Sequence, residues 1–512
     1  MTGRLGVACC LAVLTLIGFF AFPGHTYLQS DTQIYVPMME RIADPSAFPG
    51  DLVATKPHLS YTIYDEIAIG LHLPFQITLT AEQIVFRALQ LWGVYLLAAA
   101  LGLAPLAALA VTAIAGLGAT IPGPSVLLME YEPIPRGYAI GLIFLAIGLA
   151  AQGRLVWASV AASAGFLYHA PTTFPFWLCF LPLILWKRQW RALVPLLAAA
   201  GIILLVAHFQ AGVIERQHFF FRIDPEFEKL QRMRASYNWV SVWAGALMPQ
   251  YVFLWIASLV AYWRVRGAHG HAWAPVLLCL PIIGLLSVPF SYVMLERLKW
   301  GLMPQYQPAR ALLFVTAFAL ILGAAAAVRA AHWMEAFAWF TLVLAIPMKE
   351  PRQWALVAGL ALVCALAPRK LLPIPLAAAY FLMPANYAHL ETPQLGQLEE
   401  FARTKTSAEA MFVFPEAGHA LYPGIFRVRA KRSVYVDWKS GGQVNYYRSL
   451  AEEWWARWQQ LHGLQDRSHY RTEDLAQLAA EGIDYVVLPA ADELTGRSPV
   501  FRNDQFLVYR VK

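Results

Sequence analysis

The sequence has few charged residues. Asp, Glu, Lys and Arg make up 14% of its 512 residues, whereas 59% are hydrophobic. A soluble domain carries roughly a quarter charged residues, so this composition argues against a soluble enzyme and indicates a polytopic membrane protein. The net charge of +7 is modest for this length. In a membrane protein basic residues first set orientation, so nucleic acid is not an expected partner.

The sequence also has no cysteine in a polar segment and no glycine-rich phosphate loop. The five cysteines all lie in apolar runs, so the sequence offers neither a disulfide framework nor a cysteine-based metal site. No glycine-rich phosphate loop follows any strand-like run, which leaves a nucleotide-binding Rossmann domain unsupported. The cysteines are Cys9, Cys10, Cys179, Cys279 and Cys364.

Long apolar runs are what the sequence has in abundance. Thirteen of them approach the roughly 20 residues that a helix needs to span a bilayer. With thirteen spans, most basic clusters fall on the side of Arg4, which the positive-inside rule makes the cytoplasm, whereas 349-KEPR-352 falls on the other side. No small-x-small cleavage site follows the first run, so we expect an uncleaved first helix. The runs are 5–23, 84–103, 105–121, 138–152, 155–170, 172–186, 192–210, 248–263, 273–292, 309–328, 335–348, 354–367 and 370–385.

The last quarter of the chain differs in character. Residues 386–512 alternate charged and apolar stretches, with strand-like runs such as 411-MFVF-414 and 484-DYVVL-488 and two stretches of helical periodicity. The predicted fold is therefore mainly α: a polytopic transmembrane helical bundle over residues 1–385, with a large first outer loop at 24–83, and a small extracytoplasmic α/β domain over 386–512.

One short stretch raises a functional question. In 30-SDTQIYVPMMER-41, Ser30 and Gln33 have the spacing of a capping box, and Asp31 would suit the first turn of an amphipathic helix in the membrane interface. That helix-capping interpretation accounts for Asp31 without any chemistry. The alternative follows from position. A carboxylate just outside the first membrane helix lies where a lipid-borne substrate would present its head group.

This arrangement resembles the GT-C glycosyltransferase superfamily. Protein O-mannosyltransferases, oligosaccharyltransferase catalytic subunits and aminoarabinose transferases share a first outer loop that opens with an acidic residue, many further spans and an outer C-terminal domain. The strings 31-DTQIYVPMMERIADPSAFPGDL-52 and 435-YVDWKSGG-442 are also similar to an uncharacterised group of bacterial membrane proteins related to that superfamily. The resemblance implies a polyprenyl-phosphate-linked sugar as donor and a glycan, lipid or protein as acceptor.

The resemblance also implies roles for the acids. Asp31 matches the acidic residue that acts as general base or metal ligand, and Glu130 and Glu132 match a second acidic element in the next outer loop, followed by Arg136. A divalent cation, Mg²⁺ or Mn²⁺, would be held by Asp31 and Glu132. Asp31 is isolated, however, and not part of an Asp-Asp or Asp-Glu pair, which leaves metal dependence open. The alternative for 130-EYEPIPR-136 is a proline-stiffened, solvated turn.

Further polar residues at the predicted outer ends of spans are candidates for substrate binding. A departing phosphate needs cations, and arginine's planar fork suits it. Each candidate also has a structural alternative, such as a snorkelling anchor for Arg310 or a helix-end histidine for His169. The predicted substrate-binding residues are Arg136, His169, Arg297, Arg310, Asp437 and Lys439.

The sequence therefore predicts a multi-pass glycosyltransferase of the bacterial inner membrane, with a cytoplasmic N-terminus and a periplasmic C-terminal domain. Two alternatives stay open: a flippase or transporter of a lipid-linked saccharide, and a non-catalytic scaffold for envelope glycan assembly. Nearly all ionisable residues lie outside the spans, which disfavours ion-coupled transport. If the transferase interpretation holds, one groove should collect Asp31, Glu130 or Glu132, and Arg136 or Arg310.

Overall fold

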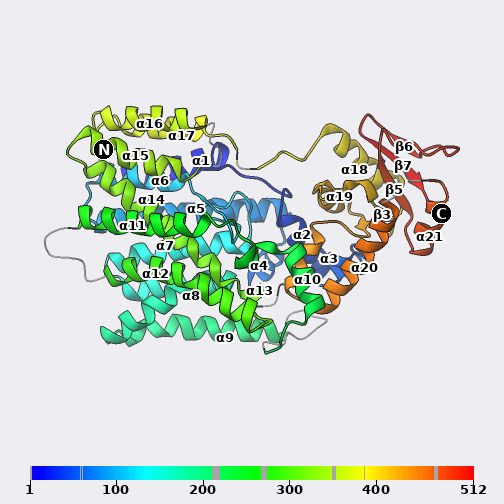
Figure 1. Cartoon of the computed structure of the whole chain (residues 1–512), viewed down its shortest axis with the longest axis horizontal. Coiled ribbons are helices and arrows are strands. Elements are labelled where there is room, and N and C mark those ends of the chain that lie inside the picture. Colours follow the sequence, from blue (N-terminus) through cyan, green and yellow to red (C-terminus); the bar gives the residue numbers. More distant parts are fainter. Residues whose placement is uncertain are drawn as a thin grey trace.

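The computed structural model describes residues 3–57, 59, 61–209, 220–266, 274–348, 353–385, 387–465 and 471–511. A bundle of helices occupies one end of the molecule and a small domain containing the main sheet occupies the other (Figure 1). The segment between α1 and α5, which the sequence predicts to be the first outer loop and which is called the first outer segment below, lies between them, with helices α2 (Thr32–Ala43), α3 (Leu52–Thr55) and α4 (Tyr64–Gly70).

Apolar helices coincide with the predicted spans. Four helical stretches are long and apolar enough by themselves to cross a bilayer: Phe75–Ala100, Trp190–Phe209, Ala274–Arg297 and Met303–Arg329. Several others are shorter, so the chain is a helical membrane protein whose count of thirteen spans stays a prediction. The helices of the bundle are α1 (Arg4–Phe20), α5 (Phe75–Ala100), α6 (Pro105–Gly116), α7 (Pro135–Ala151), α8 (Leu155–Trp186), α9 (Val194–Phe209), α11 (Leu247–Val265), α12 (Ala274–Ser291), α14 (Leu312–Arg329), α15 (Trp333–Ala345), α16 (Trp354–Leu366) and α17 (Pro373–Leu382).

Helix α8 folds back on itself at His169, whose backbone is not helical (φ −157°, ψ 88°). The hydroxyl of Ser159 donates to the carbonyl of Ala192, although a straight helix from residue 159 to 186 would be roughly 40 Å long. The few residues that follow α8 reach only about 20 Å, so the two halves must double back. The two apolar runs predicted here are therefore separate helical segments.

Pro171 explains why the chain reverses direction at this point of α8. Pro171 has no N–H with which to bond the carbonyl of Leu167, and the N–H of Ile63 donates to that carbonyl at 3.0 Å. The hydroxyl of Thr62 likewise donates to the carbonyl of Tyr168 at 2.9 Å. Two residues of the first outer segment thus donate to the carbonyls that the helix leaves unpaired at this point. These bonds fix His169 beside the segment.

Glycines let α5 and α7 pack at close range. A Cβ atom added at Gly93 would lie 2.2 Å from the carbonyl oxygen of Phe144, and one at Gly148 would lie 2.3 Å from the carbonyl oxygen of Gly93. Close backbone approach at small residues is characteristic of helix packing in membranes. These contacts lie in the C-terminal half of α7 and hold that helix, whose first turn carries Arg136, against α5.

The C-terminal region is an α/β domain, as predicted. Its five-stranded sheet has the order β4-β3-β5-β7-β6, with β3 parallel to β4 and β5, and β7 antiparallel to β5 and β6. The strand β6 was not predicted. The strands are β3 (Met411–Val413), β4 (Ser433–Val434), β5 (Tyr485–Pro489), β6 (Phe501–Arg502) and β7 (Phe506–Arg510), and the helices are α18 (Pro393–Lys405), α19 (Tyr422–Ala430), α20 (Arg448–Gln465) and α21 (Asp474–Ala480).

The prediction that α2 lies in the membrane interface is wrong. Its residues Thr32 to Ile34 and Val36 to Met39 are buried, and they share a hydrophobic core with α19 of the C-terminal domain. A Cβ atom at Gly424 would lie 2.2 Å from the side-chain oxygen of Gln33, which shows how closely the two elements approach. The C-terminal domain therefore packs directly against the first outer segment.

Candidate active site

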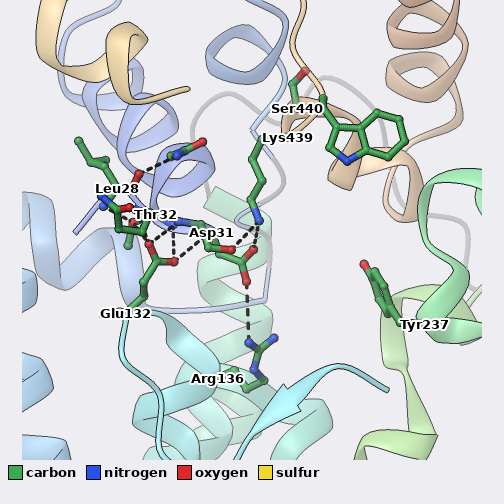
Figure 2. Close-up of polar contacts among 12 residues, drawn as sticks. Leu28, Asp31, Thr32, Glu132, Arg136, Tyr237, Lys439 and Ser440 are labelled. Atoms are coloured by element: carbon green, nitrogen blue, oxygen red, sulfur yellow. Dashed lines mark hydrogen bonds and ion pairs between the residues drawn. The ribbon is translucent and has the colours of Figure 1, made fainter. Parts of the chain in front are cut away.

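The N-terminus of α2 is held by a carboxylate from another loop. Glu132 accepts hydrogen bonds from the backbone N–H groups of Gln29 (2.8 Å), Ser30 (2.6 Å), Asp31 (2.6 Å) and Thr32 (3.4 Å), and from the Thr32 hydroxyl (2.9 Å) (Figure 2). The predicted capping role of Asp31 is wrong, because its side chain caps no backbone N–H of α2. Glu132 satisfies the exposed helix N–H groups instead, and leaves the Asp31 carboxylate for other contacts.

A buried arginine keeps these two loops together. Arg87 of α5 donates to the carbonyls of Gly18 (2.7 Å), Gly24 (2.9 Å) and Glu130 (2.8 Å). Since it joins the end of α1 to the loop that carries the acids, the backbone around Asp31 is fixed relative to Glu132.

The Asp31 side chain lies between two cations. Lys439 Nζ lies 2.7 Å from Asp31 Oδ1, and Arg136 Nη2 lies 3.8 Å from Asp31 Oδ2 (Figure 2). Burial opposes ionisation, but the charges of Lys439 and Arg136 outweigh it and hold the pKa of Asp31 well below its usual range. The side chain is still 33% exposed. Asp31 is thus an ionised acid with an open face.

The opposite shift occurs at Glu132. Burial, followed by the charge of Asp31, raises the pKa of Glu132 to about 7. All five of its contacts are donors to carboxylate oxygens, so they are made by the ionised form. Glu132 has no free oxygen with which to accept a proton from a substrate, and its role here is to position Asp31.

A cavity of about 560 Å³ opens in front of Asp31. Seven of the nine residues predicted from the sequence line it, so the expected convergence of acids and arginines occurs. Tyrosines and one further arginine that sequence reasoning missed complete the wall. The predicted lining residues are Asp31, Glu130, Glu132, Arg136, His169, Arg310 and Lys439, and the additional polar ones include Tyr35, Tyr131, Arg234, Tyr237, Gln307 and Tyr446.

Carboxylates do not fully neutralise two of the basic residues in the cavity wall, Arg136 and Arg310. Arg136 Nε donates to Glu130 Oε1 at 2.7 Å, so its charge is shared between Glu130 and Asp31. Among the residues that the structure describes, Arg310 has no carboxylate partner, and its Nε is buried without a hydrogen bond. The cavity therefore holds a surplus of positive charge, which suits an anionic ligand.

His169 presents a defined tautomer. The backbone N–H of Thr172 lies 3.3 Å from its Nδ1, and the Thr172 hydroxyl lies 2.9 Å from the same atom. Because a backbone N–H can only donate, Nδ1 accepts, and in the neutral ring Nε2 carries the proton. His169 is then a hydrogen-bond donor at the wall of the cavity.

Arg234 is the cation that sequence reasoning missed. It is the last residue of α10 (Pro225–Arg234), and it donates to the carbonyls of Trp438 (3.0 and 2.7 Å) and Lys439 (3.3 Å) while its guanidinium lies over the Trp438 ring. These bonds hold the turn that carries Lys439. The basic and aromatic residues of 214–239 predict packing in the membrane interface and leave a contact with a lipid donor open, but nothing in their composition points to residue 438.

Two predicted substrate-binding residues lie away from the cavity. Asp437 is 4% exposed, and its carboxylate pairs with Arg427 and accepts from the N–H of Ser440 at 2.8 Å. It stabilises the turn before Lys439 and has no free face for a substrate. Arg297 is exposed, and its guanidinium lies over the Tyr292 ring, so it is not brought to this cavity.

The predicted metal ligands do not fit a divalent cation. The oxygens of Glu132 accept five hydrogen bonds, and the oxygens of Asp31 face Lys439 and Arg136. Among the described residues, no group of three or more His, Cys, Asp or Glu side chains lies close enough to hold a metal ion. Hard cations require several free oxygen ligands, so we derive no step through a metal here.

Comparisons with known proteins give one structural match to report. No protein-family model and no curated protein matches the chain. The cryo-EM structure of arabinofuranosyltransferase AftD from Mycobacteria matches with 14% identity and a TM-score of 0.45, covering 96% of this chain and 35% of that one. This chain thus spans about a third of the length of that protein. The matched protein is a glycosyltransferase. With so low a TM-score, we base the function on the cavity itself.

Proposed function

We propose that the chain is a membrane glycosyltransferase of GT-C type, which transfers a sugar from a polyprenyl-phosphate donor to an acceptor hydroxyl outside the cytoplasm. One observation carries this proposal: a single open carboxylate, Asp31, faces a cavity with a surplus of cations. Glycosyl transfer requires that combination, because a base must take the proton of the acceptor hydroxyl while cations stabilise the departing phosphate.

The proposed reaction is a displacement at the anomeric carbon. The acceptor oxygen forms the new glycosidic bond as its proton moves to a carboxylate oxygen of Asp31. The bond between the anomeric carbon and the phosphate oxygen breaks, and its electron pair stays on the phosphate, beside Arg310 and Lys439. Asp31 is a weak base while Lys439 neutralises it. A bound phosphate would share the ammonium group of Lys439 and raise the basicity of Asp31 when the donor is in place.

An apolar cavity beside the polar one supports a lipid-linked donor. It measures about 290 Å³, and its wall shares Tyr35, His169 and Tyr446 with the polar cavity. Among the residues that the structure describes, no Asp, Glu, Lys or Arg lines it. Burying a hydrocarbon chain there would be favourable, and the shared wall would place the linked phosphate next to His169 and Arg310.

The alternatives fit these observations less well. A transporter needs a path through the bundle, whereas the charged residues of the site gather where the first outer segment meets the C-terminal domain. A scaffold has no need for an open acid beside an uncompensated arginine. We place the site on the periplasmic side of the bacterial inner membrane, with the N-terminus in the cytoplasm and a glycan, lipid or protein as acceptor.

Donor cleavage tests this proposal. The purified protein in lipid nanodiscs is incubated with a panel of synthetic polyprenyl-phosphate sugars, and released polyprenyl phosphate is measured by mass spectrometry. We expect release from at least one donor by the wild type, and loss of that release in Asp31→Asn. Equal release by both proteins would contradict the role of Asp31.

A further inference from the structure

A separate groove lies between α10 and α20. Its volume is about 410 Å³, and its floor includes Phe227 and Met233 of α10 and Trp455 of α20. Met233 is 41% exposed and Trp455 is half-buried. The groove therefore presents a half-exposed indole face that packing within the domain does not cover.

The rim of the groove is polar. Glu226, Lys229 and Gln459 line it with exposed side chains, and within the part of the chain that the structure describes they form no side-chain hydrogen bond or ion pair. Carboxylate, ammonium and amide groups around an aromatic face match the two sides of a sugar ring, because its C–H face is apolar and its hydroxyl groups both donate and accept.

A lipid chain would fit this groove poorly. Covering Glu226, Lys229 and Gln459 with hydrocarbon would desolvate them without offering partners. The described residues in the wall of the apolar cavity next to His169 include no charged side chain, so that cavity suits a lipid far better.

The groove and the reaction cavity are lined by neighbouring residues of the same two segments. On α10, Met233 lines the groove and the next residue, Arg234, lines the cavity. On the other side, Tyr446 lines the cavity and Arg448, two residues on, lines the groove.

We propose that the groove between α10 and α20 is a binding subsite for an oligosaccharide, the distal part of a glycan acceptor, with Trp455 as its stacking platform. This inference rests on the proposed function for its physiological role, since it names the acceptor class. Binding itself does not require transfer. Glu226, Lys229 and Gln459 bond the hydroxyl groups of the sugar unit that stacks on Trp455.

Direct binding tests the subsite. The full-length protein in lipid nanodiscs is titrated with linear mono-, di- and longer oligosaccharides of glucose, galactose, mannose and arabinose, and binding is followed by saturation-transfer NMR and calorimetry. We expect tighter binding of the longer members of at least one series. Trp455→Ala should weaken it about tenfold or more, as loss of an aromatic anchor does, whereas Trp455→Phe should keep most of it.

Two matched variants complete the experiment. Trp263→Ala removes an equally large and more exposed tryptophan from α11, and it should leave binding unchanged. Asp31→Asn should abolish transfer without altering oligosaccharide binding, so the two proposals fail separately. The subsite is overturned if no oligosaccharide binds the wild type, if Trp455→Ala behaves like Trp263→Ala, or if a photoreactive lipid labels Trp455 in place of a glycan.

Discussion

Lys439 Nζ lies 2.7 Å from Asp31 Oδ1, although the two residues are 408 positions apart in the sequence. The pair joins the C-terminal domain to the first outer segment at the wall of the cavity. A charge-assisted contact of this kind is shorter and stronger than a neutral hydrogen bond. The reaction site is therefore completed by a domain that follows all the apolar helices.

Removing this ammonium group should weaken donor binding. In Lys439→Met the phosphate loses one of the cations proposed to face it, and we expect the KM for a polyprenyl-phosphate donor to rise about tenfold or more, as for the loss of a charged hydrogen bond. Lys439→Arg keeps the charge and should retain most of the affinity. Steady-state kinetics of donor cleavage measures both. An unchanged KM in Lys439→Met would show that Lys439 only tethers the domain.

The low pKa of Asp31 predicts how stability depends on pH. Because Lys439 and Arg136 hold the pKa of Asp31 below its unfolded value of 3.8, the folded state binds fewer protons at Asp31 than the unfolded state as the pH falls. The stability that ionised Asp31 contributes is thus fully present above about pH 4 and is lost below it. Between pH 8 and about 5 the difference in thermal unfolding midpoint between wild type and Asp31→Asn should not shrink, because protonation of Glu132 near pH 7 relieves its repulsion with Asp31 in the wild type only. Below about pH 4 the difference should shrink. A difference that shrinks near neutral pH would contradict the assigned direction.

The buried ion pairs behind Lys439 should be essential for docking the C-terminal domain. Arg427 is 1% exposed, and it pairs with Asp51 of the first outer segment (2.6 Å) and with Asp437. Arg427→Met leaves two buried carboxylates without their cation, and we expect a loss of about 3–5 kcal/mol. Faster limited proteolysis between α17 and α18 would report it.

Arg429, two residues further along α19, provides the control for that variant. Its side chain is 34% exposed where it pairs with Glu391, so Arg429→Met should cost less than about 1 kcal/mol. Equal proteolysis of the two variants would mean that the buried pairs do not hold the domain. The double variant Arg427→Met with Asp437→Asn should recover part of the loss, because one uncompensated charge is gone.

Chelation should have little effect on transfer. The acids that were predicted to hold Mg²⁺ or Mn²⁺ are engaged with hydrogen-bond donors and cations. We therefore expect donor cleavage in excess EDTA to stay within about twofold of the untreated rate, with charge stabilisation supplied by arginine and lysine. Loss of activity that Mg²⁺ or Mn²⁺ restores would show that a metal displaces these contacts.

The sequence predicted the parts of the site that lie near apolar runs. Asp31, Glu130 and Arg136 stand in or next to the segments that connect apolar runs, and the order of those runs restricts which loops share a face. Arg234 and Tyr446 were missed because their place depends on how the C-terminal domain docks, which no local pattern records. Asp437 was predicted to bind substrate because it stands with Lys439 just before a glycine pair. In the structure its carboxylate instead pairs with the buried Arg427, ten residues earlier.

The same limit applies to the fold. Helical character was readable from apolar length, and the strands of the tail from their β-branched and aromatic runs. The burial of α2 could not be predicted from the sequence, because an amphipathic helix has the same pattern whether its apolar face contacts lipid or a protein domain. The hydrophobic core that α2 shares with α19, and the close approach of Gln33 to Gly424, show that the protein domain covers it.

Rescue of surface glycans by Asp31→Asn is the most direct test of the account. Surface glycans of a deletion strain are analysed by mass spectrometry after expression of wild type, Asp31→Asn or Asp44→Asn at equal membrane levels. Asp44 is an exposed acid of the same outer segment, and among the described residues its side chain accepts hydrogen bonds from Ser46 alone. We predict that wild type and Asp44→Asn restore the missing glycan and that Asp31→Asn does not. Full restoration by Asp31→Asn would contradict the proposal that its carboxylate takes the acceptor proton.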